Sequence, residues 1–205
     1  MIDRRDIIMN ETINNLITRR SVRSFQKEQI SEEQLNEILT AGTYAASGMG
    51  RQSAIMVVIQ NPEIIKRLSK LNAAIMDSEN DPFYGAPTVV VVLGDSTIGT
   101  YLEDGALVMG NLLNAANAVG VDSCWIHRAK EVFMSTEGKE LLKQWGIDEK
   151  YVGIGNCILG YGKEPKPEAK PRKDNYIYRV WESQRFLFLK ESECNEVCIN
   201  SCNCF

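Results

Sequence analysis

The sequence predicts an α/β or α+β sandwich, and three observations support this prediction. Short apolar runs typical of buried strands alternate with segments whose apolar residues recur at helical spacing. One helical segment is long, rich in small residues and poor in charge, which is typical of a helix packed in the core or against another subunit. The length of 205 residues, with 44% hydrophobic and 24% charged residues, fits one domain with a short appendage.

The first half of the chain is expected to contain a helix before residue 19, then a helix, a strand and another helix. Ser31 and Gln34 form a capping box at the start of the second helix, and Gly42 is expected to end it. The run over residues 55–59 predicts a buried strand. Asn61 as N-cap and Pro62 in the first turn predict the next helix.

The second half continues the alternation of strands and helices. A Pro-rich and Lys-rich stretch over residues 163–172 is expected to be extended. The elements before it are, in order, a central strand over 88–93, a long helix over 98–119, a short strand over 124–126, a helix over 139–145 and a last strand over 151–159.

Composition and charge exclude several classes of protein. The net charge of −4 and the pI of about 5.2 argue against nucleic acid as the main partner. Apolar runs fall short of the ~20 residues that span a bilayer. The first residues are charged and lack the apolar core of a secretory signal. We therefore expect a cytoplasmic protein with no membrane partner.

The segment over residues 19–25, Arg-Arg-Ser-Val-Arg-Ser-Phe, concentrates three guanidinium groups and two hydroxyls on an acidic chain. Such a tight cluster indicates a site for one small anion, most simply a phosphate. Neither a Walker loop nor a Gly-x-Gly-x-x-Gly turn is present in the sequence, so side chains would hold that anion. A second basic stretch over residues 170–173 could join the same phosphate. Charge by itself leaves two solvated basic faces as an equal alternative.

The six cysteines are unevenly distributed. Cys124 and Cys157 lie in the body of the chain and are most simply buried small hydrophobes, while the other four crowd the end as Cys194, Cys198, Cys202 and Cys204. Their spacing matches neither zinc pairs nor ferredoxin runs, so we predict no metal site. An iron–sulfur or metal centre remains the minor alternative to an extension. We predict a domain over residues 1–181 and a Cys-rich tail over 182–205.

Several short motifs in order resemble the nitroreductase family. Each motif is weak by itself, but together they cover roughly residues 10 to 180. They are the arginine segment over 19–25, Ala46-Ser47-Gly48-Met49-Gly50-Arg51-Gln52, Asn72, Gly85-Ala86-Pro87, Gly105-Ala106, Ser123-Cys124-Trp125-Ile126 and the Lys-Pro-Arg stretch over 170–172.

The resemblance implies a fold and a cofactor. The fold would be a three-layer α-β-α sandwich with a mainly antiparallel central sheet and a long buried central helix. The protein would be a homodimer with FMN at the subunit interface and NAD(P)H as electron donor. Hydride would pass to flavin N5 and then, by a ping-pong mechanism, to a nitroaromatic, quinone or flavin acceptor. This chemistry needs no catalytic side chain, because the protein supplies position, electrostatics and an open face.

The resemblance also implies a set of cofactor-binding residues. Arg19, Lys170 and Arg172 would bind the phosphate together with Ser21, and Arg23 would approach the N1/O2 edge of the ring. Asn72 would bind the pyrimidine edge, and the partner subunit would supply its small-residue loop. The complete predicted set is Arg19, Arg20, Ser21, Arg23, Ser47, Gly48, Met49, Gln52, Asn72, Trp125, Ile126, His127, Lys170 and Arg172.

The sequence departs from the family pattern at positions next to the expected flavin. Gly50 stands where many members have Asn, Ser53-Ala54 stands where Pro-Trp is frequent, and Ile75 replaces a basic residue after Asn72. The first two departures bear on acceptor specificity, and the third leaves Arg23 as the main charge expected near flavin N1. Two alternative functions stay open, namely a specialised flavin enzyme on the same fold and a non-enzymatic FMN-binding redox sensor.

Overall fold

The computed structural model describes residues 10–180. By contacts the chain divides into two units, residues 1–169 and residues 170–205, and each is described by itself. The predicted boundary between residues 181 and 182 stays a prediction. The four clustered cysteines of the predicted tail lie outside the described residues.

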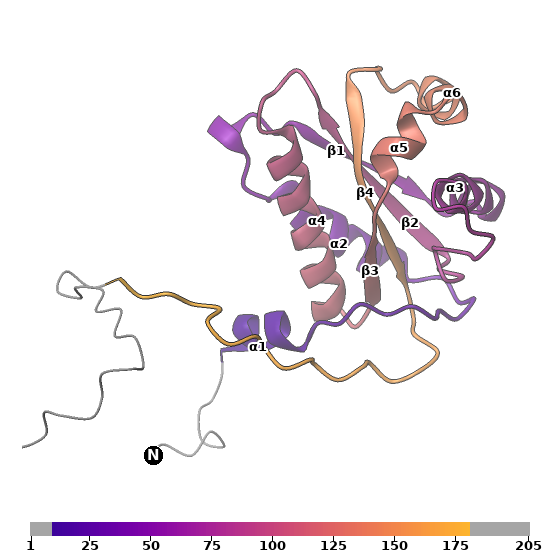
Figure 1. Ribbon diagram of the computed structural model, residues 1–205. Helices are drawn as coiled ribbons and strands as arrows, with labels where there is room; N and C mark the ends of the chain where they lie inside the picture. Colours follow the sequence, from indigo (N-terminus) through magenta and orange to yellow (C-terminus); the bar gives the residue numbers. More distant parts are fainter. Residues whose placement is uncertain (1–9, 181–205) are drawn as a thin grey trace, which may run out of the picture. The chain divides into compact units, whose positions relative to one another are not determined.

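A four-stranded antiparallel sheet forms the centre of the first unit (Figure 1), in the order β1-β2-β4-β3. Every ladder is antiparallel, which confirms the sheet type that the family resemblance implied. The strands are β1 (Ala54–Ile59), β2 (Thr88–Asp95), β3 (Asp122–Ile126) and β4 (Tyr151–Gly160).

Helices cover both faces of the sheet, so the described fold has the three layers that the resemblance implied (Figure 1). The central strand β2 is buried along its whole length, and its side chains alternate between two apolar clusters, one under each helical layer. The helical elements are α1 (Glu11–Thr18), α2 (Glu32–Thr43), the 3₁₀ turn η1 (Gly48–Gly50), α3 (Pro62–Ala74), α4 (Tyr101–Ala118), α5 (Ala129–Met134) and α6 (Thr136–Gln144).

The two capped helix starts expected from the sequence are confirmed, whereas α4 begins three residues later than expected and one expected helix end is wrong. Ser31 and Gln34 form the full capping box of α2, and Asn61 caps α3 with Pro62 following. Gly42 does not end α2, because the helix continues to Thr43. A Cβ at Gly42 would lie 2.7 Å from a sulfur of β1 and 2.9 Å from a methyl of α4, so this glycine permits close packing instead.

Helix α5 was not expected from the sequence, and α6 begins three residues earlier than predicted. A helix of six residues is too short to show a helical period. The start of α6 is set by the Ser135 side chain, which accepts a hydrogen bond from the Gly138 N–H at 3.1 Å.

Helix α4 packs one face into the core and leaves another face exposed in the single chain. Its buried residues include Met109 and Leu112, whereas Leu102 and Leu107 are 46% and 49% exposed. Even so, no helix within residues 10–180 is long and apolar enough to cross a membrane. Leu102 and Leu107 therefore give this central helix an apolar face that is open to solvent in the single chain.

Candidate functional site

The arginine cluster begins where α1 ends and runs along the edge of β3. Arg19 is the C-cap of α1 and donates its backbone N–H to the Asn15 carbonyl at 3.1 Å. Ser21 then forms a parallel bridge with Ser123 of β3, and the next residue donates its N–H to the Ser123 carbonyl at 3.1 Å. The cluster is therefore fixed against the strand that leads to residues 125–127.

The guanidinium groups of the cluster differ in their surroundings. Arg19 is half-buried, and its Nη1 is buried with no hydrogen-bond partner among the described residues. Arg20 turns back on the backbone, where its Nη1 donates to the carbonyls of Ile17 and Arg19 at 2.7 and 2.8 Å. Arg23 is exposed. Arg20 Nε is likewise buried without a partner among the described residues, so Arg19 and Arg20 each keep one buried donor that an anion would satisfy.

Two buried amide side chains hold the end of β3. Asn72 on α3 is 1% exposed and donates from Nδ2 to the His127 carbonyl at 2.8 Å. Asn156 on β4 donates from Nδ2 to the Ile126 carbonyl at 3.4 Å. Arg128, which follows His127, has a left-handed φ of 73°. The chain therefore leaves β3 through a strained turn. This turn holds two of the predicted flavin-facing residues in a defined orientation.

Asn72 also presents a buried acceptor with no donor. Its Oδ1 has no hydrogen-bond partner within residues 10–180, although its Nδ2 is engaged. A buried amide oxygen without a donor is costly, so such an atom commonly marks a ligand position. Along β3, the four residue steps from Ser123 to His127 span ~13 Å. A ligand with an anionic end and a donor end could satisfy both Arg19 and Asn72.

The predicted small-residue loop over residues 47–53 is built around a buried carboxylate. Asp104 in the first turn of α4 is 3% exposed and accepts the Gly48 N–H at 2.8 Å on Oδ1. Its Oδ2 accepts the Ser53 hydroxyl at 2.6 Å and the Thr100 hydroxyl at 3.2 Å. The Ser53 hydrogen bond holds the pKa of Asp104 below its ordinary value, although burial acts in the opposite direction.

A second hydrogen bond closes this loop on itself. The Ser47 hydroxyl accepts the Gln52 N–H at 3.0 Å, and both Met49 and Gln52 adopt left-handed φ values of 54° and 50°. Met49 is 87% exposed at the tip. The loop therefore presents an apolar side chain to the outside from a fixed backbone.

The two parts of the predicted site lie at opposite ends of α4. The loop contacts Asp104 in the first turn, whereas Asn117 near the last turn donates to Oδ1 of Asn15 in α1 at 2.6 Å. Thirteen residues of helix separate these contacts, which is ~20 Å along the axis. One chain consequently does not bring Ser47, Gly48 and Gln52 to the arginine cluster.

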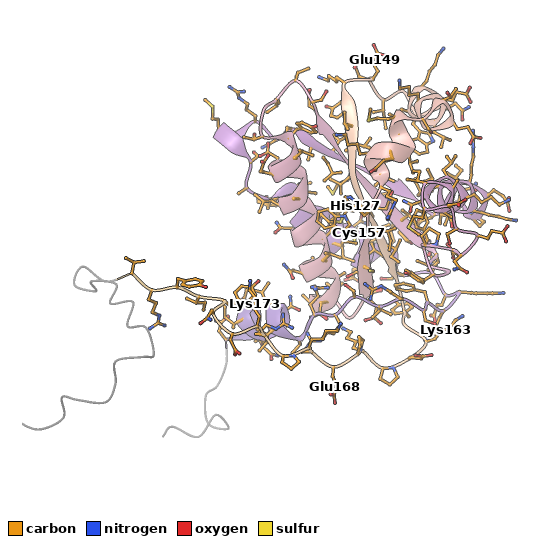
Figure 2. All side chains as sticks on the ribbon, viewed as in Figure 1. His127, Glu149, Cys157, Lys163, Glu168 and Lys173 are labelled. Carbon is orange, nitrogen blue, oxygen red and sulfur yellow. The ribbon has the colours of Figure 1, made fainter. Side chains whose placement is uncertain are left out.

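The single histidine lies midway along the sheet, between the end that carries Glu149 and the end that carries Lys163 (Figure 2). Its side chain is exposed, and its carbonyl makes the hydrogen bond to Asn72. Trp125 is half-buried and packs against the core cluster under α2 and α4, as expected for a packing residue. Burial raises the pKa of the Cys157 thiol, which Arg19 opposes weakly, so this thiol stays protonated.

Lys170 and Arg172 belong to the second unit and are exposed there. Arg172 donates from Nε and Nη2 to the Lys170 carbonyl at 3.2 and 2.6 Å. Their predicted place at the phosphate stays a prediction. Within the described ranges, no group of three or more His, Cys, Asp or Glu residues gathers as a metal site would.

A groove of about 990 Å³ runs beside α3, between that helix and the segments over 27–29 and 78–87. Its lining includes none of the predicted cofactor-binding residues. The groove is therefore distinct from the cluster formed by Arg19, Asn72 and the end of β3.

Sequence reasoning missed the residues that position the site. Asp104, Ser53 and Thr100 support the loop, and Asn156 supports the end of β3. A signal was present for Asp104, since it is a charged residue in a helix whose other core-facing residues are small or apolar. Asn156 lies inside an apolar strand run and is detectable in the same way.

Comparisons with known proteins agree with this arrangement. The Nitroreductase family model matches residues 16–163. An Archaeoglobus fulgidus protein named as an NADH dehydrogenase/NAD(P)H nitroreductase is 29% identical over 164 residues, which is 77% of this chain and 89% of that protein. Two solved nitroreductases with bound FMN, each matched over 84% of this chain and 100% of theirs, also resemble it. They come from Bacteroides fragilis (28% identity, TM-score 0.78) and Desulfitobacterium hafniense (30% identity, TM-score 0.76).

Proposed function

The chain belongs to the nitroreductase family, and from this premise we propose that it is an FMN-dependent oxidoreductase that takes electrons from NAD(P)H. The acceptors would be nitroaromatics, quinones or flavins. Bound FMN would supply the redox chemistry, taking hydride at N5 and returning electrons to an acceptor by a ping-pong mechanism. The FMN-bound relatives support the choice of cofactor.

The single observation that carries the proposal is the set of unsatisfied buried atoms beside β3, with donors on Arg19 and Arg20 and an acceptor on Asn72. Arg19 Nη1 is a cationic donor, which suits a phosphate oxygen. Asn72 Oδ1 is an acceptor, which suits the N–H on the pyrimidine edge of a flavin. The residues present therefore fit FMN in both charge and hydrogen-bonding sense.

The chain's own residues would bind and orient rather than transfer protons. Arg19 and Ser21 would hold the phosphate end, joined by Lys170 and Arg172, and Arg23 would place positive charge near the ring. Asn72 would fix the ring edge and, through its bond to the His127 carbonyl, also fix the backbone at the end of β3. No side chain is assigned as a general acid, base or nucleophile.

The proposal includes a homodimer, and two features of the single chain support it. The loop over residues 47–53 lies at the opposite end of α4 from the arginine cluster. In a dimer, the loop of one subunit would reach the cluster of the other. The exposed apolar residues Leu102 and Leu107 on α4 provide a surface that such a partner would cover.

The decisive experiment is the spectrum of the purified protein with added FMN. We expect a yellow protein whose bound flavin is bleached by NAD(P)H without oxygen and restored by a quinone or nitroaromatic. A protein that takes up no FMN would contradict the proposal. Bound flavin that NAD(P)H cannot reduce would instead favour the redox-sensor alternative.

The dimer is tested separately by the variant Leu107→Asp. Burying a new carboxylate at a subunit interface is costly, so we expect the variant to elute as a monomer in light-scattering chromatography. Loss of the dimer should also lower FMN retention, because the loop would come from the partner. A wild-type protein that is monomeric at micromolar concentration would contradict this part of the proposal.

A further inference from the structure

Asp104 is a buried carboxylate that the proposed chemistry does not use directly. It lies in the first turn of α4 among core-facing residues that are otherwise small or apolar. A carboxylate 3% exposed is costly to bury unless donors surround it. Three donors surround it, two from the loop over residues 47–53 and one from Thr100 just before α4.

Two of the three donors to Asp104 bracket the loop over residues 47–53, and the third is Thr100, which precedes α4. The Gly48 N–H and the Ser53 hydroxyl, at 2.8 and 2.6 Å, secure the two ends of the loop. The Ser53 carbonyl in turn accepts the Asp95 N–H at 2.9 Å, which ties the loop end to β2. One carboxylate thus connects the loop with α4, while a backbone bond connects it with the sheet.

Close packing strengthens this arrangement. A Cβ at Gly48 would lie 2.5 Å from Oγ1 of Thr100, the residue that also donates to Asp104. Left-handed backbone at Met49 and Gln52 is unfavourable for these residue types and persists only where surrounding contacts determine it. Because the tip itself is exposed, the contacts that determine this backbone are those of Asp104 with Gly48 and Ser53, together with the Ser47–Gln52 hydrogen bond that closes the loop.

We propose that Asp104 is a positioning residue for the cofactor site. Its carboxylate fixes the loop over 47–53 in the shape that presents Ser47, Gly48 and Gln52, with Met49 at the tip, to the flavin of the partner subunit. The reach to the partner rests on the proposed function, whereas the fixing of the loop rests on the contacts described above. Asp104 acts through the loop and contacts no reacting atom.

The order of the loop can be measured by proteolysis, because Arg51 is an exposed trypsin site between Met49 and Gln52. Limited trypsin digestion followed by mass spectrometry measures how often the loop opens for cleavage after Arg51. For Asp104→Ala we expect cleavage about tenfold faster than in the wild type, as loss of strong charge-assisted hydrogen bonds implies. Ser53→Ala, which removes one donor and keeps the carboxylate, should give a smaller increase.

Matched variants separate this role from a general loss of stability. Glu103→Ala removes the neighbouring exposed carboxylate in the same turn and should leave cleavage after Arg51 unchanged. Asp104→Asn keeps an acceptor oxygen and should be intermediate. Melting temperatures measured alongside show whether the whole protein has loosened. Should Asp104→Ala fail to fold, Ser53→Ala and Asp104→Asn carry the test.

The second measurement is FMN binding, followed by flavin fluorescence on the same variants. We expect bound FMN to protect Arg51 in the wild type, and the FMN dissociation constant to rise about tenfold in Asp104→Ala. Cleavage after Arg51 that is equal in Asp104→Ala and wild type would overturn the inference. So would faster cleavage with unchanged FMN affinity. A wild type that binds no FMN would instead refute the proposed function. The trypsin digestion would still test whether Asp104 orders the loop.

Discussion

At the N-terminal end of α4, both oxygens of Asp104 accept hydrogen bonds from the loop and from Thr100. The second region lies beside β3, where buried polar atoms of Arg19 and Arg20, which follow α1, and of Asn72 on α3 have no partner among the described residues. The first region is complete as folded, and the second has two donors and an acceptor left over. Buried polar groups are normally paired, so the second region is the part that a ligand completes.

The two regions therefore have different roles, structural support in the first and ligand binding in the second. The loop in the first region is held rigidly by the chain itself, so its shape is already formed before a cofactor binds. The cluster in the second region tolerates unsatisfied atoms because the cofactor would satisfy them. Mutations in the two regions should therefore fail in different ways. Direct loss of FMN contacts is expected at the cluster, whereas at the scaffold the loop should lose order first and FMN binding should weaken as a consequence.

The largest effect is expected for Arg19→Ala. Removing a charge-assisted donor to phosphate should weaken FMN binding about 10- to 100-fold, measured by fluorescence titration. Stability without FMN should change little, because Arg19 Nη1 has no protein partner to lose. The control is Arg67→Ala, which removes an exposed arginine paired with Glu137 at 3.4 Å. Unchanged FMN affinity in Arg19→Ala would show that the phosphate lies elsewhere.

A smaller, mixed effect is expected for Asn72→Ala. The variant loses the donor to the His127 carbonyl and should lower the free energy of unfolding by ~1–3 kcal/mol. It should also weaken FMN binding about tenfold, since the buried acceptor is lost. Asn111→Ala is a matched control, because Asn111 donates from Nδ2 to the Ala41 carbonyl at 2.8 Å away from the cluster. Equal FMN affinity in the two variants would remove Asn72 from the site.

The smallest effect concerns acid stability at the scaffold end. Hydrogen bonds from Thr97 and Lys150 lower the pKa of Asp95 from 3.8 to about 2. A depressed pKa stabilises the fold above the unfolded value, and this contribution is lost as the pH falls from about 4 toward 2. Urea unfolding of Asp95→Asn should depend less steeply on pH in that window than the wild type does. FMN affinity of Asp95→Asn at pH 7 should equal that of the wild type. A changed affinity would contradict the separation of scaffold residues from FMN-binding residues.

Most of the fold was predictable from local sequence because its signals are local. The capping box of Ser31 with Gln34 and the Asn61-Pro62 start depend on side chains within one turn of the helices that they begin. The strand β2 is a continuous apolar run from Val89 to Leu93, as burial on both faces requires. Gly42 and α5 were missed because one depends on contacts with β1 and α4, and the other is too short for a period.

The residue types of the candidate site were visible in the sequence, whereas their roles were not. The arginine segment and the family resemblance suggested a phosphate and a flavin, and Asn72 was part of that set. Which atoms remain unsatisfied depends on how distant segments meet, as when α3 brings Asn72 to the His127 carbonyl. The same holds for Asp104, whose donors lie up to 56 positions away in the chain.

The sequence by itself determined the family, the order of the main elements and the presence of an anion-binding cluster on an acidic chain. These follow from composition, periodicity and short motifs, which need no knowledge of distant contacts. Only the tertiary structure decided that Arg20 turns to its own backbone, that Arg19 and Asn72 retain free buried atoms, and that Asp104 organises the loop. Hydrogen-bond satisfaction is a property of three-dimensional neighbours, and no local pattern specifies those neighbours.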